Sequence, residues 1–404
     1  MHDKLLTIFT STYNRAYSLT PLYKSLVRQK DKRFQWLIVD DGSTDDTADL
    51  IKQWHKECSL EIKTQQPVRI SWIDWAKVFL IYFMVVGHFH PPLIQSQFFF
   101  VFHMPAFFII SGYLYHPHDW RRTVVSLMTP VVVFSVFNLG FQFLETVLKG
   151  GVFDTSNIVE RTLWPFLGGV PKAGMDYMIL FMGAWFPIVL MIIRLVVGDI
   201  RTLSFVYRYK VSIFFVSIAF MITLPFWADM EGTICQLKPF LFFPSLPFFL
   251  LGAMLHDINS EKAHKWLNRL VPLFFVCYLV MALWNGRVGI LNLHFGHNYF
   301  FFFIGAVSGS FVLFWVCSHL RDNLFVRTIS IGTMLILGLH MDFYEVLFPI
   351  LNRLGFYAIF PDWAVIWIAA ALTLVLSYLP IRWCMRHMPI LLGKISTFNS
   401  KGNH

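Results

Sequence analysis

The chain has 404 residues, of which 56% are hydrophobic and 18% aromatic, while only 14% are charged. Ordinary globular proteins have about 25% charged residues, so this composition excludes a soluble globular protein and indicates an integral membrane protein. The net charge of +9 fits cytoplasmic loops beside an anionic lipid surface. It does not indicate a nucleic-acid partner, because no basic run is interleaved with exposed aromatic residues. We therefore expect membrane lipid, and no nucleic acid, among the partners.

The first 65 residues are predicted to form a small head in which strands and helices alternate. Strands are expected at LLTIFTST, FQWLIVDD and LEIKTQ, and helices at LTPLYKSLVRQ and TDDTADLIKQWHKE. The acidic residues after the second strand open the next helix, where the helix dipole favours them and Ser43 or Thr44 can cap the N-terminus. Turn chemistry alone could account for this stretch. The order of elements predicts a βαβαβ unit.

Two loops of this head resemble the beginning of a family-2 glycosyltransferase of the Rossmann-like GT-A fold. They are TSTYNR after the first strand and VDDGSTDDT after the second. In that family these loops hold the nucleotide, so the resemblance implies nucleotide contacts by Thr12, Asn14, Arg15, Asp40 and Asp41. The family's domain continues through a metal-binding DxD strand and a catalytic carboxylate, whereas this chain enters an apolar segment after IKTQQ. We therefore expect a truncated head with a vestigial nucleotide site.

The remainder of the chain consists mostly of apolar segments about 20 residues long, the length that crosses a bilayer. They predict about ten transmembrane helices, near residues 72–90, 97–115, 123–148, 175–198, 210–227, 239–256, 266–284, 297–318, 328–350 and 357–380. The sequence thus predicts a polytopic α-helical membrane protein. We expect four parts, a head (1–65), a linker (66–71), a transmembrane domain (72–384) and a tail (385–404).

The distribution of charge predicts the orientation. An even number of spans places both termini on one side of the membrane. With a cytoplasmic N-terminus, the inner loops and tail hold more than twice as many Lys and Arg as the outer loops. The positive-inside rule therefore favours a bacterial-type inner membrane protein with both termini in the cytoplasm. The N-terminal stretch MHDKLLTIFTSTYNR lacks the apolar core and cleavage site of a signal peptide, which agrees with this orientation.

The first span, SWIDWAKVFLIYFMVVGHFH, carries the strongest chemical signal. Lys77 and His88 are about three helical turns and about 16 Å apart, so they share one face of the helix. If Lys77 and Asp74, spaced as an i,i+3 pair, lie at the cytoplasmic boundary, His88 lies near the middle of a hydrocarbon layer about 30 Å thick. Ionisable side chains inside spans are candidates for functional sites. A buried histidine can also serve only to bond a backbone carbonyl.

The following segments carry a second resemblance. QFFFVFHMPAFFIISGYLY contains His103, and HPHDWRRTVVSLMTPVVVF contains the pair Arg121 and Arg122. With the Lys-x10-His spacing, they resemble the acyltransferase-3 family of membrane acyltransferases, especially its fucose 4-O-acetylase-like branch. The segments MGAWFPIVLM, FPSLPFFLLGAML and ISIGTMLILGLH, the last ending in His340, extend the resemblance over about residues 68–385.

This resemblance implies transfer of an acyl group, usually acetyl from acetyl-CoA, to a hydroxyl of a cell-surface or lipid-linked glycan. His88 would be the catalytic histidine, because a neutral imidazole can take the proton of a sugar hydroxyl and desolvation favours the neutral form. An acetyl-imidazole relay is a variant mechanism. His103, His340, Lys77 and Asp74 complete the candidate catalytic set.

Arg121 and Arg122 are the candidates for binding the phosphates of acyl-CoA, although such a pair also marks the cytoplasmic side of a span. Lys77 takes the place of the family's usual arginine, which keeps the charge but loses the bidentate geometry. For His103 and His340, hydrogen bonding in the core is an equally good interpretation. The five cysteines include no CxxC pair, so no zinc site, other metal site or disulfide framework is predicted.

Two other functions are compatible with the sequence. In the first, the head transfers sugar in polysaccharide synthesis and the spans only anchor a family-2 glycosyltransferase. In the second, the protein transports a glycan or a lipid, for which polar residues inside the spans are also expected.

Overall fold

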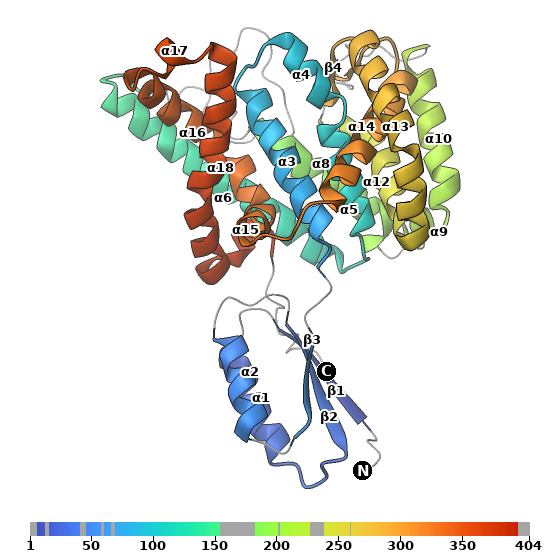
Figure 1. Ribbon diagram of the computed structural model, residues 1–404, viewed down its shortest axis with the longest axis vertical. Coiled ribbons are helices and arrows are strands. Elements are labelled where there is room, and N and C mark those ends of the chain that lie inside the picture. Colours follow the sequence, from blue (N-terminus) through green and yellow to red (C-terminus); the bar gives the residue numbers. More distant parts are fainter. Residues whose placement is uncertain are drawn as a thin grey trace. The chain divides into compact units, whose positions relative to one another are not determined.

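The computed structural model describes residues 6–12, 16–40, 46–57, 60–65, 69–153, 182–200, 203–226, 238–258 and 260–394. It divides the chain into two compact units, Met1–Ile70 and Ser71–His404 (Figure 1). Each unit is described by itself.

The first unit has the βαβαβ order that the sequence predicts. Its elements are β1 (Leu6–Thr12), α1 (Ala16–Val27), β2 (Phe34–Asp40), α2 (Thr47–Glu57) and β3 (Ile62–Gln65). The strands form one parallel sheet in the order β1-β2-β3. The predicted turn caps Ser43 and Thr44 lie outside the described residues.

The core of this unit is aromatic. Phe34, Trp36 and Ile38 are buried at alternate positions of β2, because residues two apart in a strand face the same side of the sheet. The ring of Trp36 stacks on Tyr23 of α1 at 6.5 Å and on Trp54 of α2 at 5.8 Å. Both helices therefore cover the same face of the sheet (Figure 1).

The second unit is helical. Its helices are α3 (Ser71–His88), α4 (Leu93–Phe100), α5 (His103–Tyr113), α6 (Trp120–Leu148), α8 (Trp185–Arg194), α9 (Phe205–Arg208), α10 (Lys210–Thr223), α12 (Phe242–His256), α13 (Ser260–Trp284), α14 (Tyr299–Ser318), α15 (Leu324–Ile331), α16 (Thr333–Arg353), α17 (Phe356–Ile359) and α18 (Asp362–His387). A π-helical turn, Leu195–Asp199, continues α8. The two-residue strands β4 (Val288–Gly289) and β5 (His294–Phe295) pair in an antiparallel manner.

Within the described residues, seven helical segments are long and apolar enough to cross a membrane. They are Leu93–Tyr113, Trp120–Leu148, Pro239–His256, Lys265–Trp284, Tyr299–Ser318, Thr333–Arg353 and Asp362–His387. Further apolar helices are α3, α8 and α10. The prediction of a polytopic α-helical membrane protein with a small βαβαβ head is confirmed.

Several predicted span boundaries are wrong in detail. The predicted span 97–115 is two helices, α4 and α5, separated at residues 101–102. The predicted span 328–350 is divided at Gly332 into α15 and α16, and the last span begins at Asp362, directly after Pro361, instead of at residue 357. Part of the predicted span 175–198 lies outside the described residues.

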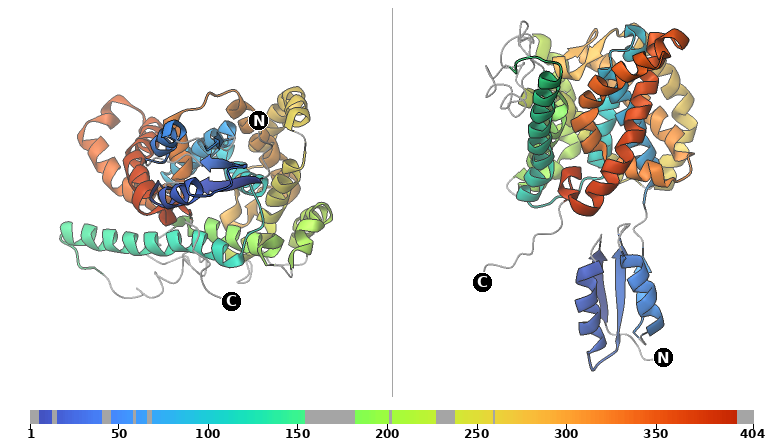
Figure 2. Two further views of the ribbon diagram at one scale, coloured as in Figure 1. Left: turned by 90° about the horizontal axis from the view of Figure 1, so that it is seen from below. Right: turned by 90° about the vertical axis from the view of Figure 1, so that its left-hand side faces the viewer.

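Helix α3 occupies the centre of the unit. It contacts α5 and α14 on one side and α15, α16 and α18 on the other (Figures 1 and 2). Behind it, α5 and α12 approach each other closely. A Cβ at Gly112 would lie 1.9 Å from the carbonyl oxygen of Phe249, and a Cβ at Gly252 would lie 1.9 Å from that of Ile109. Glycine is therefore required on both helices at this crossing, as in membrane helix pairs generally.

Candidate functional site

The structure brings two of the predicted histidines into direct contact. His88 is the last residue of α3, and His340 lies in α16. Nδ1 of His88 is 2.7 Å from Nε2 of His340, and the two rings are stacked with centroids 4.8 Å apart. His340 is 1% exposed, whereas His88 is only partly buried. The pair therefore has one buried member and one that reaches the edge of the packed core.

The hydrogen bonds determine which nitrogens of a neutral pair carry protons. Nδ1 of His340 is 2.9 Å from the carbonyl oxygen of Leu337, which can only accept, so this nitrogen donates. Nε2 of a neutral His340 then has a lone pair, which accepts the Nδ1–H of His88. Nε2 of His88 is consequently left with a lone pair, the property required of a general base.

His103 is another predicted histidine of this region. It is the first residue of α5, it is 7% exposed, and its Nδ1 donates to the carbonyl oxygen of Phe99 at 2.9 Å. His103 and His90 lie close enough to His88 to interact with it electrostatically. His103 thus lies near the imidazole pair, but its hydrogen bond is to the carbonyl of Phe99, four residues earlier in the chain.

Asp74 and Lys77 lie elsewhere on α3. Asp74 is about 21 Å and Lys77 about 16 Å from His88 along the helix axis. The Asp74 carboxylate is buried and accepts a hydrogen bond from the Ser330 hydroxyl at 2.6 Å. The structure therefore does not bring these two predicted site residues to the imidazole pair. Asp74 instead fixes α3 against α15.

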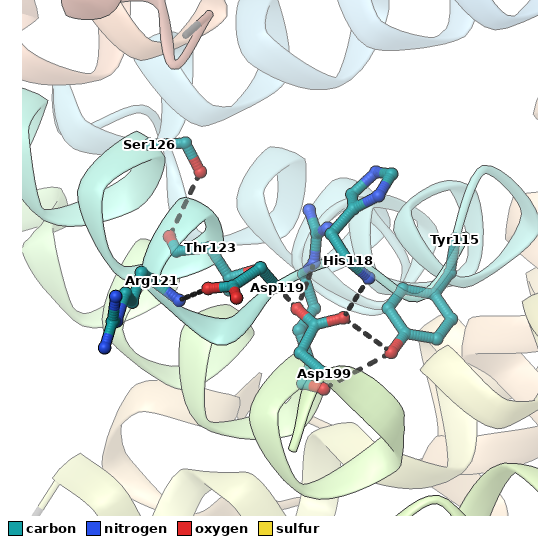
Figure 3. A network of polar contacts seen from close by, with 8 residues as sticks. Tyr115, His118, Asp119, Arg121, Thr123, Ser126 and Asp199 are labelled. Carbon is teal, nitrogen blue, oxygen red and sulfur yellow. Dashed lines mark hydrogen bonds and ion pairs between the residues drawn. The ribbon is translucent and has the colours of Figure 1, made fainter. Parts of the chain in front are cut away.

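Arg121 and Arg122 begin α6. The Asp119 side chain caps this helix by accepting from the backbone nitrogen of Arg121 at 2.8 Å (Figure 3). The guanidinium of Arg121 lies over the Trp120 ring. Further along α6, the Asn138 amide donates to the carbonyl oxygen of Gly338 at 3.0 Å, two residues before His340. Arg122 and Asn138 are about 24 Å apart along the helix, so the arginine pair and the imidazole pair lie at different levels of the unit.

A buried polar network that the sequence did not predict lies next to the arginine pair. Asp199 is 3% exposed and accepts from the Tyr115 hydroxyl at 2.8 Å, from the backbone nitrogen of His118 at 3.0 Å and from the Thr123 hydroxyl (Figure 3). Nε of Arg194 lies 3.6 Å from the same carboxylate. The network joins the loop after α5, the first turn of α6 and the π-helical turn after α8.

Burial and nearby charged groups shift the pKa values of two side chains in this network. Burial and the nearby Asp199 carboxylate raise the pKa of the Tyr115 hydroxyl, which therefore remains a donor. Burial lowers the pKa of His118, and the positive charges of Arg122 and Arg194 lower it further. Asp199 thus pairs with Arg194, and both Arg194 and Arg122 lie close enough to His118 to act on its charge. The only sequence signal was an Arg and an Asp at the end of an apolar segment.

The predicted nucleotide site of the head is partly described. Thr12 and Asp40 are buried at the carboxyl ends of adjacent parallel strands, where they are paired in register. Asn14, Arg15 and Asp41 lie outside the described residues. The structure therefore brings together the two predicted contacts that it describes, at the sheet edge where nucleotide-binding α/β folds hold their ligands.

No group of three or more His, Cys, Asp or Glu within the described ranges could hold a metal ion. Comparison with known families gives two matches. The model of an acyltransferase domain family matches residues 70–382, more than half of the chain, and the model of glycosyl transferase family 2 matches residues 7–70. No curated protein and no solved structure matches the chain. The two family matches meet where the structure divides the chain into its two units.

Proposed function

The chain belongs to the acyltransferase domain family and carries an N-terminal fragment of glycosyltransferase family 2, and from this premise we propose that it is a membrane O-acetyltransferase of the fucose 4-O-acetylase-like branch. It moves an acetyl group from acetyl-CoA to a hydroxyl of a cell-surface or lipid-linked glycan. The hydrogen-bonded pair of His88 and His340 is the observation that supports this function, because it leaves a lone pair on Nε2 of His88.

In this reaction the lone pair on Nε2 of His88 takes the proton of the sugar hydroxyl. The oxygen attacks the thioester carbonyl, the C–S bond breaks, and the proton on Nε2 passes to the departing CoA sulfur. His340 stays hydrogen-bonded to Leu337 and accepts from Nδ1–H throughout, which holds the His88 ring in one tautomer and one orientation. In the variant with an acetyl-imidazole relay, the same lone pair attacks the thioester first.

The donor enters from the end of the unit that carries Arg121 and Arg122. Guanidinium groups form charge-assisted hydrogen bonds with phosphates, and Arg194, held by Asp199, adds a third cation to this region. Arg122 lies about 24 Å along α6 from the level of His340, and in this proposal the pantetheine arm extends from the arginine pair towards the imidazole pair. Lys77, on α3, is a further cation between these two levels.

In this proposal the protein lies in a bacterial-type inner membrane with both termini in the cytoplasm, and the arginine pair faces the cytoplasmic acetyl-CoA pool. The head is vestigial in this proposal. Its family match ends at residue 70, and every candidate catalytic side chain lies in the second unit. The alternative of an anchored glycosyltransferase would require the head to catalyse instead.

Mass spectrometry of surface glycans from cells with and without the gene tests the proposal. We expect glycans from the producing cells to be heavier by one acetyl group per modified residue. Equal acetylation in both samples would contradict the proposal. Absence of the whole glycan from the cells without the gene would instead favour the glycosyltransferase or the transporter.

A further inference from the structure

A cavity of about 560 Å³ begins at Tyr344, four residues after His340 on α16, and is not used by the chemistry described above. Its lining comes from the C-terminal half of α16 and from α17, and consists of Tyr344, Glu345, Phe348, Pro349, Asn352 and Tyr357. Three aromatic rings, a carboxylate and an amide therefore face one space.

The wall of this cavity contacts the turn that follows His88. Tyr344 lies one helical turn after His340 on α16. The ring of Phe89, the residue after His88, lies 5.3 Å from the ring of Tyr344 and 5.4 Å from that of Phe348. The partly buried imidazole and the cavity are therefore neighbours at the same end of α3.

The cavity lies at the end of the unit away from the arginine pair. Helices α6 and α16 run in the same direction, because Asn138 bonds to Gly338 and, further along both helices, Lys149 pairs with Glu345 at 3.9 Å. Lys149, directly after α6, is about 40 Å along this helix from Arg122. The imidazole pair lies between the two ends.

We propose that this cavity binds a pyranose ring of the acceptor glycan, a proposal that rests on the function proposed above. Tyrosine and phenylalanine rings offer apolar faces to the C–H groups of a sugar, while the Glu345 carboxylate and the Asn352 amide bond its hydroxyls. Binding sites for small polar molecules combine apolar walls with a few polar groups in this way.

The same lining disfavours the other ligands of the reaction. Glu345 and Glu145 interact at this end and share one cation, Lys149, so the phosphates of acetyl-CoA would meet a less favourable charge here than at the arginine pair. A lipid tail would shield the Glu345 carboxylate and the Asn352 amide from water, which is costly. Donor and acceptor therefore approach His88 from opposite ends of the unit, and the acceptor enters on the non-cytoplasmic side.

Two cavity residues can be changed without disturbing the core, since Asn352 and Tyr357 are both exposed. We would produce Asn352→Ala, Tyr357→Ala and the double variant in cells, with Val346→Ala as the matched control. Val346 is an equally exposed residue of α16 that does not line the cavity. Acetylation of surface glycans is measured by mass spectrometry at equal protein amounts. Donor binding is measured as the rise in melting temperature of the purified protein on addition of acetyl-CoA.

Each single variant is expected to lower glycan acetylation about tenfold, as for the loss of one hydrogen bond or one aromatic contact, with Val346→Ala unchanged. Stabilisation by acetyl-CoA should stay at the parent level. Acetylation at the control level in the double variant overturns the acceptor site and leaves the proposed function intact. If the variants lose both the stabilisation by acetyl-CoA and glycan acetylation, the acceptor site is overturned as well. The cavity residues would then affect donor binding or folding. A parent that neither binds acetyl-CoA nor acetylates glycans would instead refute the proposed function.

Discussion

The head and the membrane unit bring their candidate polar residues together by different means. In the head, Thr12 and Asp40 end two neighbouring strands, and the strand register alone places them side by side. In the membrane unit, His88 and His340 are 252 residues apart, and only the packing of α3 against α16 joins them. A sequence motif can therefore reveal a site like that of the head. A site like that of the membrane unit is visible in the sequence only as separate candidate residues.

The two units also differ in what their candidate residues can do. The described part of the head offers two buried contacts at a sheet edge and a core built around Trp36. The membrane unit offers a hydrogen-bonded imidazole pair, two arginines in the first turn of α6 and a polar aromatic cavity. The comparison predicts that catalysis depends on the second unit alone, and the variants below test that division from the largest expected effect to the smallest.

His88→Gln is expected to lower acetyl transfer about 10²–10⁴-fold while the protein still accumulates in the membrane. Glutamine can keep the hydrogen bond to His340, but its amide cannot accept a proton at neutral pH. The measurement is glycan acetylation at equal protein amounts. Near-native acetylation in this variant would make His88 structural, and His103 or His340 would then be tested as the base.

His340→Ala should lower kcat about 10–100-fold with little change in the KM for acetyl-CoA. The reason is that the Nδ1–H of His88 loses its partner and the ring loses its fixed tautomer. Because the effect acts through His88, the pH profile of kcat should change as well.

His103→Ala is the matched control for this variant. Both histidines are buried and both donate to a backbone carbonyl, but only His340 is hydrogen-bonded to His88. A smaller loss in His103→Ala is expected. Equal losses in the two variants, with unchanged pH profiles, would indicate that both histidines act only in packing.

Replacing Arg121 and Arg122 together by alanine should raise the KM for acetyl-CoA about tenfold or more, and lower kcat less. Each arginine that binds phosphate contributes a charge-assisted hydrogen bond to the donor in both the ground state and the transition state. Steady-state kinetics in membranes at varied acetyl-CoA measure the effect. If the KM does not change, the pair serves only to orient the helix in the membrane.

Changes to the head should have the smallest effect. Deleting residues 1–65 is expected to leave acetyl transfer largely intact, and so is Trp36→Ala in the full chain, which removes the centre of the head's core at a cost of about 3–5 kcal/mol to that unit. Acetylation per inserted molecule is the measurement. Strong loss of activity in both variants, at normal abundance and insertion, would mean that the head takes part in the reaction.

Much of the architecture follows from the sequence because its signals are local. Apolar segments of bilayer length predict the helical membrane unit, and the alternation of elements in the head predicts the parallel sheet that the structure has. Ends of helices were harder to predict. The break between α4 and α5 and the break at Gly332 fall inside continuous apolar runs, where hydropathy carries no signal.

The sequence by itself determined which side chains are candidates, since an ionisable group such as His88 or His340 is conspicuous in an apolar segment. Only the tertiary structure decided how they combine. It paired His88 with His340 and left His103 bonded to the carbonyl of Phe99. It also placed Asp74 far from the imidazoles, where Asp74 accepts from Ser330. The physical reason is that a hydrogen bond between helices depends on their relative direction and level. The direction and level of each helix follow from packing over the whole unit, so the spacing of residues along the chain does not predict them.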